Sequence, residues 1–166
     1  MHTVWRAFIK PVKFFYKLFI NLFSIEWSED KWLIFEQFVK FASVGLSNTF
    51  ISYLINVLVL RMMISSNASW DFYLANIVAF LLSVLWSFYW NNKYVFVTSE
   101  VNKRSICKTL LKTYSAYAFT GLILANFLSW VWIDLYNFSK YIAPLINLII
   151  SVPVNFLLNK LWAFKV

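Results

Sequence analysis

Asparagine and serine side chains recur at helical spacing through otherwise apolar stretches of the chain. Within each of three runs most of these residues are four positions apart, so that they share one face of a helix. Amides and hydroxyls in hydrocarbon need hydrogen-bonding partners, and they suit the hydroxyl groups of a polar ligand or the polar groups of a neighbouring helix. Both interpretations stay open. The three runs are Asn48, Ser52 and Asn56; Asn76, Ser83, Ser87 and Asn91; and Asn147, Ser151, Asn155 and Asn159.

Three lysines flank the apolar stretches that carry these runs. Lys40 precedes the first, and Lys93 and Lys160 follow two others. Placed at one membrane surface, their ammonium groups are point charges suited to phosphate. The alternative is that each one anchors its helix by reaching toward the headgroups.

Residues for covalent or proton-transfer chemistry are scarce. His2 is the only histidine and Cys107 the only cysteine, and there is no glycine-rich phosphate loop, so no catalytic residues, metal or cofactor are expected. No carboxylate lies well inside an apolar stretch, which disfavours a proton-coupled drug exporter. The acidic residues are Glu26, Glu29, Asp30, Glu36, Asp71, Glu100 and Asp134.

The elements that position the polar runs are predicted from composition. The chain of 166 residues is 61% apolar and 13% charged, against about 45–50% and about 25% in soluble domains. A spanning helix needs about 20 mostly apolar residues. Four stretches qualify, at about residues 41–64, 72–90, 114–133 and 141–158. The sequence therefore predicts an all-α membrane protein with four transmembrane helices.

Basic residues predict how these helices are oriented. Of the 15 Lys and Arg residues, all but Arg61 and Lys140 lie in the two terminal segments or the middle loop. By the positive-inside rule, both termini and the middle loop face the cytoplasm. Residues 1–35 form a basic, aromatic segment that predicts an amphipathic interfacial helix, with a partly disordered basic tail as the alternative. Residues 36–166 form the membrane domain.

The second pair of predicted helices echoes the first. Ala42, Gly45 and Leu46 align with Ala118, Gly121 and Leu122, and the ends of the second and fourth helices share the pattern Asn-x-x-aromatic-small-Phe at 91–96 and 159–164. Two hairpins that both begin in the cytoplasm form a parallel repeat. For the glycines, close helix packing is the alternative explanation.

Three ordered motifs carry a family resemblance. They are Lys40-Phe41-x-x-Val44-Gly45-x-x-Asn48-Thr49, then Phe88-x-x-Asn91-x-Lys93-Tyr94-Val95-Phe96, then Asn155-Phe156-x-x-Asn159-Lys160-x-Trp162-Ala163-Phe164. Over residues 36–166 the chain resembles the GtrA-like family of small four-helix bacterial membrane proteins. The resemblance implies that it moves a polyprenyl-phosphate-linked monosaccharide, such as undecaprenyl-phosphate glucose, to the outer leaflet of the bacterial cytoplasmic membrane. A separate glycosyltransferase would then decorate O-antigen, teichoic acid or another surface polymer.

This resemblance leads to a hypothesis for the binding residues. Lysines would attract the phosphate, amides would bind phosphate oxygens or sugar hydroxyls, and interfacial aromatic rings would stack on the sugar. The expected partners are the lipid-linked sugar, membrane lipids, a membrane glycosyltransferase and a second copy of the chain, but no nucleic acid. The alternative is a scaffold that docks the glycosyltransferase and transports nothing. The candidate residues are Lys40, Asn48, Asn91, Lys93, Tyr94, Asn155, Asn159, Lys160 and Trp162.

Overall fold

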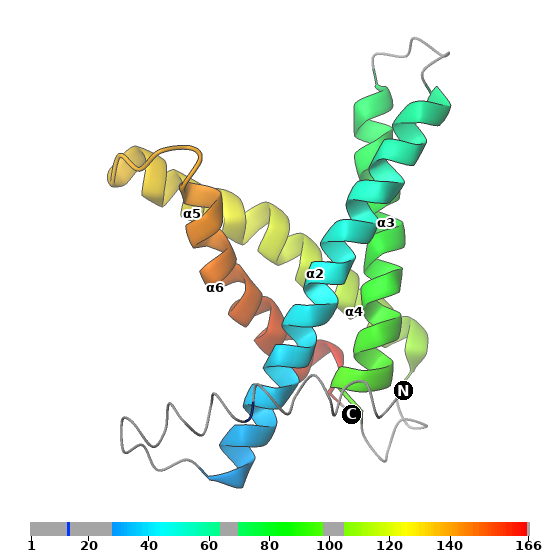
Figure 1. Ribbon diagram of the computed structural model, residues 1–166, viewed down its shortest axis with the longest axis vertical. Coiled ribbons are helices and arrows are strands. Elements are labelled where there is room, and N and C mark those ends of the chain that lie inside the picture. Colours follow the sequence, from blue (N-terminus) through cyan, green and yellow to red (C-terminus); the bar gives the residue numbers. More distant parts are fainter. Residues whose placement is uncertain (1–12, 14–27, 64–69, 98–104, 166) are drawn as a thin grey trace. The chain divides into compact units, whose positions relative to one another are not determined.

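The computed structural model describes residues 13, 28–63, 70–97 and 105–165. Throughout these residues the regular secondary structure is helical, and they contain no strand (Figure 1). The chain divides into two compact units, residues 1–39 and residues 40–166. Most of the interfacial helix predicted within residues 1–35 lies outside the described residues and stays a prediction.

Each of the four predicted spans is present as a helix. α2 comprises Glu29–Met63, and α3 (Asp71–Trp90) continues into the π-helical turn η1 (Asn91–Val95). The third span is built from α4 (Ile106–Ala118), η3 (Phe119–Leu124), α5 (Ala125–Trp130) and η4 (Val131–Leu135). The fourth joins α6 (Ala143–Leu158) to η5 (Asn159–Ala163). Among the described residues, these four helices are long and apolar enough to cross a membrane, which confirms the predicted fold class.

Two helices begin earlier than hydropathy predicts. α2 starts at Glu29 rather than near residue 41, and the acidic side chains of Glu29 and Asp30 in its first turn interact favourably with the helix dipole. α4 starts at Ile106 rather than near residue 114, because Ser105 caps it by accepting a hydrogen bond from the backbone N–H of Lys108 at 3.5 Å. Hydropathy reports where a helix is apolar, whereas caps determine where it begins.

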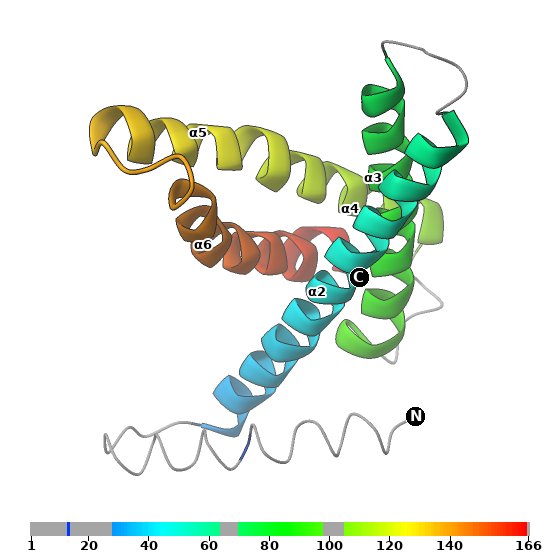
Figure 2. The same cartoon turned by 45° about the horizontal axis from the view of Figure 1, so that its top comes forward.

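Within residues 40–166 the helices form two hairpins, α2 with α3 and α4/α5 with α6 (Figure 2). In the first hairpin, Trp86 Nε1 donates to Ser47 Oγ at 3.2 Å. In the second, Asn147 Nδ2 donates to Ser129 Oγ at 2.7 Å and to the Ala125 carbonyl at 3.0 Å. Asn147 therefore links two helices by hydrogen bonds. This is the interpretation in which the polar runs bond to a neighbouring helix rather than to a ligand.

Five phenylalanines join the two hairpins near the C-terminal ends of α3 and α6. Lys93 and Lys160 lie in the π-helical turns that follow these ends. The rings of Phe96 and Phe164, which are equivalent in the repeat, stack with centroids 4.6 Å apart. Phe88 stacks on Phe164 at 5.7 Å, and Phe41 meets Phe156 edge-on at 5.6 Å. All five side chains are buried. We call this set the phenylalanine cluster, and the end of the unit that it occupies the basic end.

The internal repeat has the same local backbone in both halves. In η1 the Phe96 N–H donates to the Asn91 carbonyl, and in η5 the Phe164 N–H donates to the Asn159 carbonyl, both at 2.8 Å. Both are π-type hydrogen bonds that widen the last helical turn. The shared Asn-x-x-aromatic-small-Phe pattern thus produces a shared turn that directs its terminal Phe into the cluster.

Close packing does not account for the two glycines. A Cβ atom built on Gly45 or Gly121 would meet no described atom within 4 Å outside the local backbone. The structure therefore gives no support to the alternative in which these glycines let neighbouring helices approach each other.

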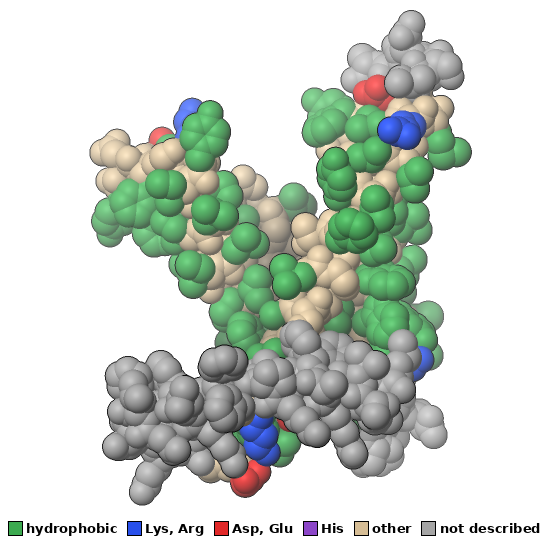
Figure 3. All heavy atoms as spheres, viewed as in Figure 1, with side chains coloured by type: hydrophobic (Ala, Val, Ile, Leu, Met, Phe, Trp, Pro, Cys, Tyr) green, Lys and Arg blue, Asp and Glu red, His purple; other side chains and the backbone are tan. Residues whose placement is uncertain are grey.

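Large apolar side chains cover the outward faces of the helices, whereas charged side chains lie toward their ends (Figure 3). Leu46 and Ile149, near the middle of their spans, are 76% and 74% exposed. Such surfaces are suited to contact with lipid acyl chains, whereas in water they would promote aggregation.

Candidate ligand-binding site

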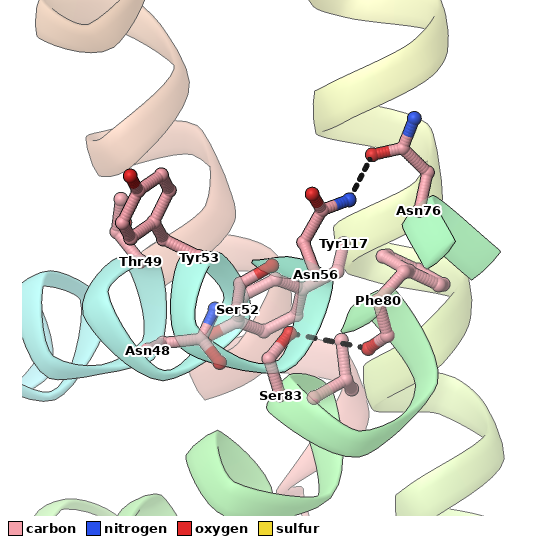
Figure 4. Close-up of a pocket in the computed structure, with 10 residues that line it drawn as sticks. Asn48, Thr49, Ser52, Tyr53, Asn56, Asn76, Phe80, Ser83 and Tyr117 are labelled. Atoms are coloured by element: carbon pink, nitrogen blue, oxygen red, sulfur yellow. Dashed lines mark hydrogen bonds between the residues drawn. The ribbon is translucent and has the colours of Figure 1, made fainter. Parts of the chain in front are cut away.

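A polar groove of about 470 Å³ lies between α2, α3 and one side chain of α4 (Figure 4). Five of its ten lining residues come from α2 and four from α3, so two of the three predicted polar runs meet here. None of the ten is an acidic or basic residue. The lining residues are Asn48, Thr49, Ser52, Tyr53, Asn56, Asn76, Phe80, Ser83, Val84 and Tyr117.

Hydrogen bonds fix part of this lining and leave part of it available. Asn56 Nδ2 donates to Asn76 Oδ1 at 2.8 Å, and the two amides point toward each other across the groove (Figure 4). Ser83 Oγ donates to the Phe80 carbonyl on its own helix at 3.2 Å. Asn48 Oδ1 is buried and accepts no hydrogen bond from the described residues. Asn48, which lines the groove, therefore carries a buried acceptor that no described residue satisfies, and a ligand could reach this oxygen if the side chain rotates.

Asn91 is connected to the groove through two other side chains. It is 0% exposed, and its Nδ2 donates to Ser87 Oγ at 3.1 Å. The Ser87 hydroxyl lies 2.6 Å from the hydroxyl of Tyr117, which lines the groove. Asn91 is thus linked to the groove without being part of its surface.

Two other candidate asparagines bond to each other and do not line the groove. Asn159 Nδ2 donates to the side-chain oxygen of Asn155 at 2.9 Å and to its carbonyl at 2.8 Å. Asn159 is 0% exposed, and its Oδ1 has no partner among the described residues. The structure therefore separates the last run of the sequence from the other two.

Cations and aromatic rings gather at the basic end. Lys93 Nζ donates to the Tyr89 hydroxyl at 2.9 Å and lies 5.5 Å from the centre of the Tyr94 ring, which stacks on Trp90. Lys160 Nζ lies 5.6 Å from the centre of the Phe156 ring.

Two further candidates lie on the flanks of this end. Lys40 is half-buried on α2. Trp162 is exposed, its carbonyl accepts a hydrogen bond from Lys112 Nζ at 3.0 Å, and that ammonium lies 5.7 Å from the centre of its ring. Lys112 thus adds a fourth cation to the three that the sequence pattern indicates.

Sequence reasoning missed Tyr117 and the polar face that α4 shares with η3. Thr109, Thr113 and Thr120 are buried, and Thr113 Oγ1 donates to the Thr109 carbonyl at 2.9 Å. Their spacing of four and seven residues was a usable signal for one helix face. Tyr117 gave no such signal, because its ring counts as apolar in a periodicity analysis although its hydroxyl is polar.

The chemistry available in the groove is hydrogen bonding by neutral groups. Amides both donate and accept, and hydroxyls do the same, so the lining matches a ligand rich in hydroxyl groups. In the described part of the chain, no cluster of three histidine, cysteine or acidic side chains is placed to hold a metal ion.

Comparison with known proteins places this arrangement in a family. The profile of the GtrA/DPMS transmembrane domain matches residues 40–164, which include the groove, the phenylalanine cluster and the π-helical turns η1 and η5. No curated protein matches the chain, and neither does any solved structure. The match covers most of the chain and agrees with the four spanning helices. The chain therefore belongs to the GtrA/DPMS transmembrane domain family and is a multi-pass membrane protein.

Proposed function

We propose that this protein moves a polyprenyl-phosphate-linked monosaccharide from the cytoplasmic to the outer leaflet of a bacterial cytoplasmic membrane. The observation that carries the proposal is the uncharged polar groove between two membrane-spanning helices. Membership of the GtrA/DPMS family supports a lipid-linked sugar as the ligand.

The depth of the groove suits translocation. At about 1.5 Å of rise per residue, Asn48, Ser52 and Asn56 lie about 12, 18 and 24 Å along α2 from Lys40. The hydrocarbon core is about 30 Å thick. Polar groups are therefore available from the middle of the membrane, where a crossing headgroup is most poorly solvated, toward the surface opposite the basic end.

The energetic reason for such a groove lies in the sugar. A hydroxyl transferred from water to an apolar medium without a partner costs about 2–7 kcal/mol. A groove that supplies amide and hydroxyl partners removes much of this cost, while the polyprenyl tail remains in the lipid. Asn48 can contribute once its side chain rotates, because its buried oxygen has no partner among the described residues.

The phosphate is attracted by the lysines of the basic end. An ammonium group has three donors, so Lys93 can bind a phosphate oxygen while it keeps its bond to Tyr89. Lys160 is half-buried and can bind from the second hairpin. Tyr94 and Trp162 offer rings at the same end for stacking on the sugar. With both termini in the cytoplasm, this end faces the leaflet where lipid-linked sugars are made.

In this proposal the protein has no catalytic role. Consumption of the sugar lipid by a glycosyltransferase on the outer side drives net movement, because the groove contains no titratable carboxylate to couple a proton gradient. The acceptor polymer would be O-antigen, teichoic acid or another surface glycan.

Transport by the purified protein tests the proposal. A polyprenyl-phosphate hexose with a fluorescent tail is placed in the outer leaflet of liposomes that contain only this chain, and its movement is followed. Lys93→Ala/Lys160→Ala is expected to slow movement by at least about tenfold, because each charge-assisted hydrogen bond to phosphate contributes about 1.5–3 kcal/mol.

The matched control is Lys108→Ala, which removes an exposed lysine near the start of α4. It is expected to leave the rate unchanged. If folded wild-type protein moves no more probe than empty liposomes, the proposal is wrong, and the scaffold that docks a glycosyltransferase becomes the better account. Equal rates for the wild type and the double variant would refute phosphate binding by these lysines.

A further inference from the structure

The two halves of the repeat share a backbone frame but differ in the side chains on one face. Alignment of Gly45 with Gly121 places Leu124, Leu128 and Trp132 at the positions equivalent to Asn48, Ser52 and Asn56. The second half thus has apolar residues at the three positions where the first half has polar groove residues. At these three positions the second half therefore lacks the polar side chains that line the groove in the first half.

The hydrogen-bonded chain behind the groove is asymmetric in the same way. It runs from Asn91 through Ser87, both in the first half, to Tyr117 on α4 of the second half. The equivalent residues are Asn159 and Asn155 in the second half and Phe41 on α2 of the first half. Asn159 bonds to Asn155 as Asn91 bonds to Ser87, but Phe41 has no hydroxyl to continue the chain.

Phe41 has another role in its half of the repeat. It is 2% exposed and packs against Phe96 and Phe156 in the phenylalanine cluster. Tyr117 at the equivalent position is half-buried and lines the groove. The two halves have therefore diverged at this position. Phe41 packs in the phenylalanine cluster, whereas Tyr117 lines the groove.

We propose that Tyr117 contacts the sugar of the lipid-linked substrate and that Ser87 and Asn91 position its hydroxyl. The inference rests on the proposed function and assigns its sugar-contacting residue. Whether Ser87 donates to Tyr117 or accepts from it, the phenol keeps a hydrogen-bonding position for a sugar hydroxyl. Asn91, buried beneath the groove, is a positioning residue that acts through Ser87.

Tyr114 provides a matched control for this role. One turn earlier on α4, its hydroxyl donates to the Leu81 carbonyl of α3, so it also links the two helices. It does not line the groove. If the Tyr117 hydroxyl only linked helices, Tyr117→Phe and Tyr114→Phe would have the same effects.

The test is equilibrium binding of a short-chain polyprenyl-phosphate glucose to the full chain in detergent, with thermal unfolding measured alongside. Tyr117→Phe is expected to raise Kd by about five- to tenfold, the loss of one ligand hydrogen bond. Ser87→Ala is expected to raise Kd in the same direction, and Ser87→Ala/Tyr117→Phe no further than Tyr117→Phe alone. Tyr114→Phe is expected to keep the wild-type Kd.

Each result bears on the inference. A Kd for Tyr117→Phe equal to that of Tyr114→Phe overturns it, as does a wild-type chain that binds none of the probe. Additive effects of Ser87→Ala and Tyr117→Phe would overturn the positioning role of Ser87. If the wild type binds the probe with these Kd differences but moves none of it in liposomes, translocation fails while the assignment of Tyr117 stands.

Discussion

Ser52→Phe is expected to slow movement of a lipid-linked hexose in liposomes by more than tenfold while the protein still folds. Ser52 lines the groove from the middle of α2, and a benzyl group there occupies space in a groove of about 470 Å³. It also removes a hydroxyl and presents an apolar surface to the sugar, whose hydroxyl groups then lose partners at a cost of about 1–3 kcal/mol each. The rate is measured with the same tail-labelled probe as for the lysine variants.

The control for this substitution is Leu46→Phe, which adds a ring on the exposed face of the same helix. Leu46 is 76% exposed and does not line the groove. This variant is expected to transport at the wild-type rate. Wild-type transport by a folded Ser52→Phe protein would show that the headgroup crosses by another route.

Phe96→Ala and Phe164→Ala are expected to cause the largest losses of stability, each about 3–5 kcal/mol. Both rings are buried in the phenylalanine cluster and stack on each other, so removal of either leaves a cavity that the two hairpins line together. The free energy of unfolding is measured by denaturant titration in mixed micelles.

The pair also tests the structural equivalence of the two halves. Because the rings are in contact, the double variant is expected to lose less stability than the two single losses added together. Leu161→Ala, at an exposed position in η5, is the control and is expected to change stability by less than about 1 kcal/mol. Full additivity, or a small loss for either Phe variant, would contradict the packing described for this cluster.

Much of the fold was predictable because a membrane imposes a length and a polarity on its helices. Four apolar stretches could be recognised from composition alone, and all four are helices. Their ends were less predictable. The start at Ile106 depends on the cap formed by Ser105, and the π-helical turns after α3 and α6 extend the spans into segments containing Lys93 and Lys160, where hydropathy falls.

The site was predictable in part, because helical periodicity identifies a face but not the element opposite it. Asn48 lines the groove as expected of a ligand-binding residue. Asn155 and Asn159 show the same spacing, yet they bond to each other within one helix. Residues four apart share a face, so they can satisfy each other's amides without a ligand or a second helix.

Tyr117 shows a different limit of sequence reasoning. It aligns with Phe41 in the repeat, and both are aromatic residues within apolar stretches. Only the structure separates them, by placing one in the phenylalanine cluster and the other beside Ser87 at the groove. The polar tip of a tyrosine becomes informative once its neighbours are known.

Thiol labelling in the groove tests most directly whether the sugar crosses there. In a Cys107→Ser background, which removes the exposed native thiol, Thr49→Cys places a cysteine in the groove lining, and Leu46→Cys places one on the exposed face one turn earlier. The proposal predicts that a polar thiol reagent modifies position 49 and not position 46, that the lipid-linked hexose slows this modification, and that the adduct stops transport. Full transport after complete modification of position 49, with no protection by the hexose, would contradict it.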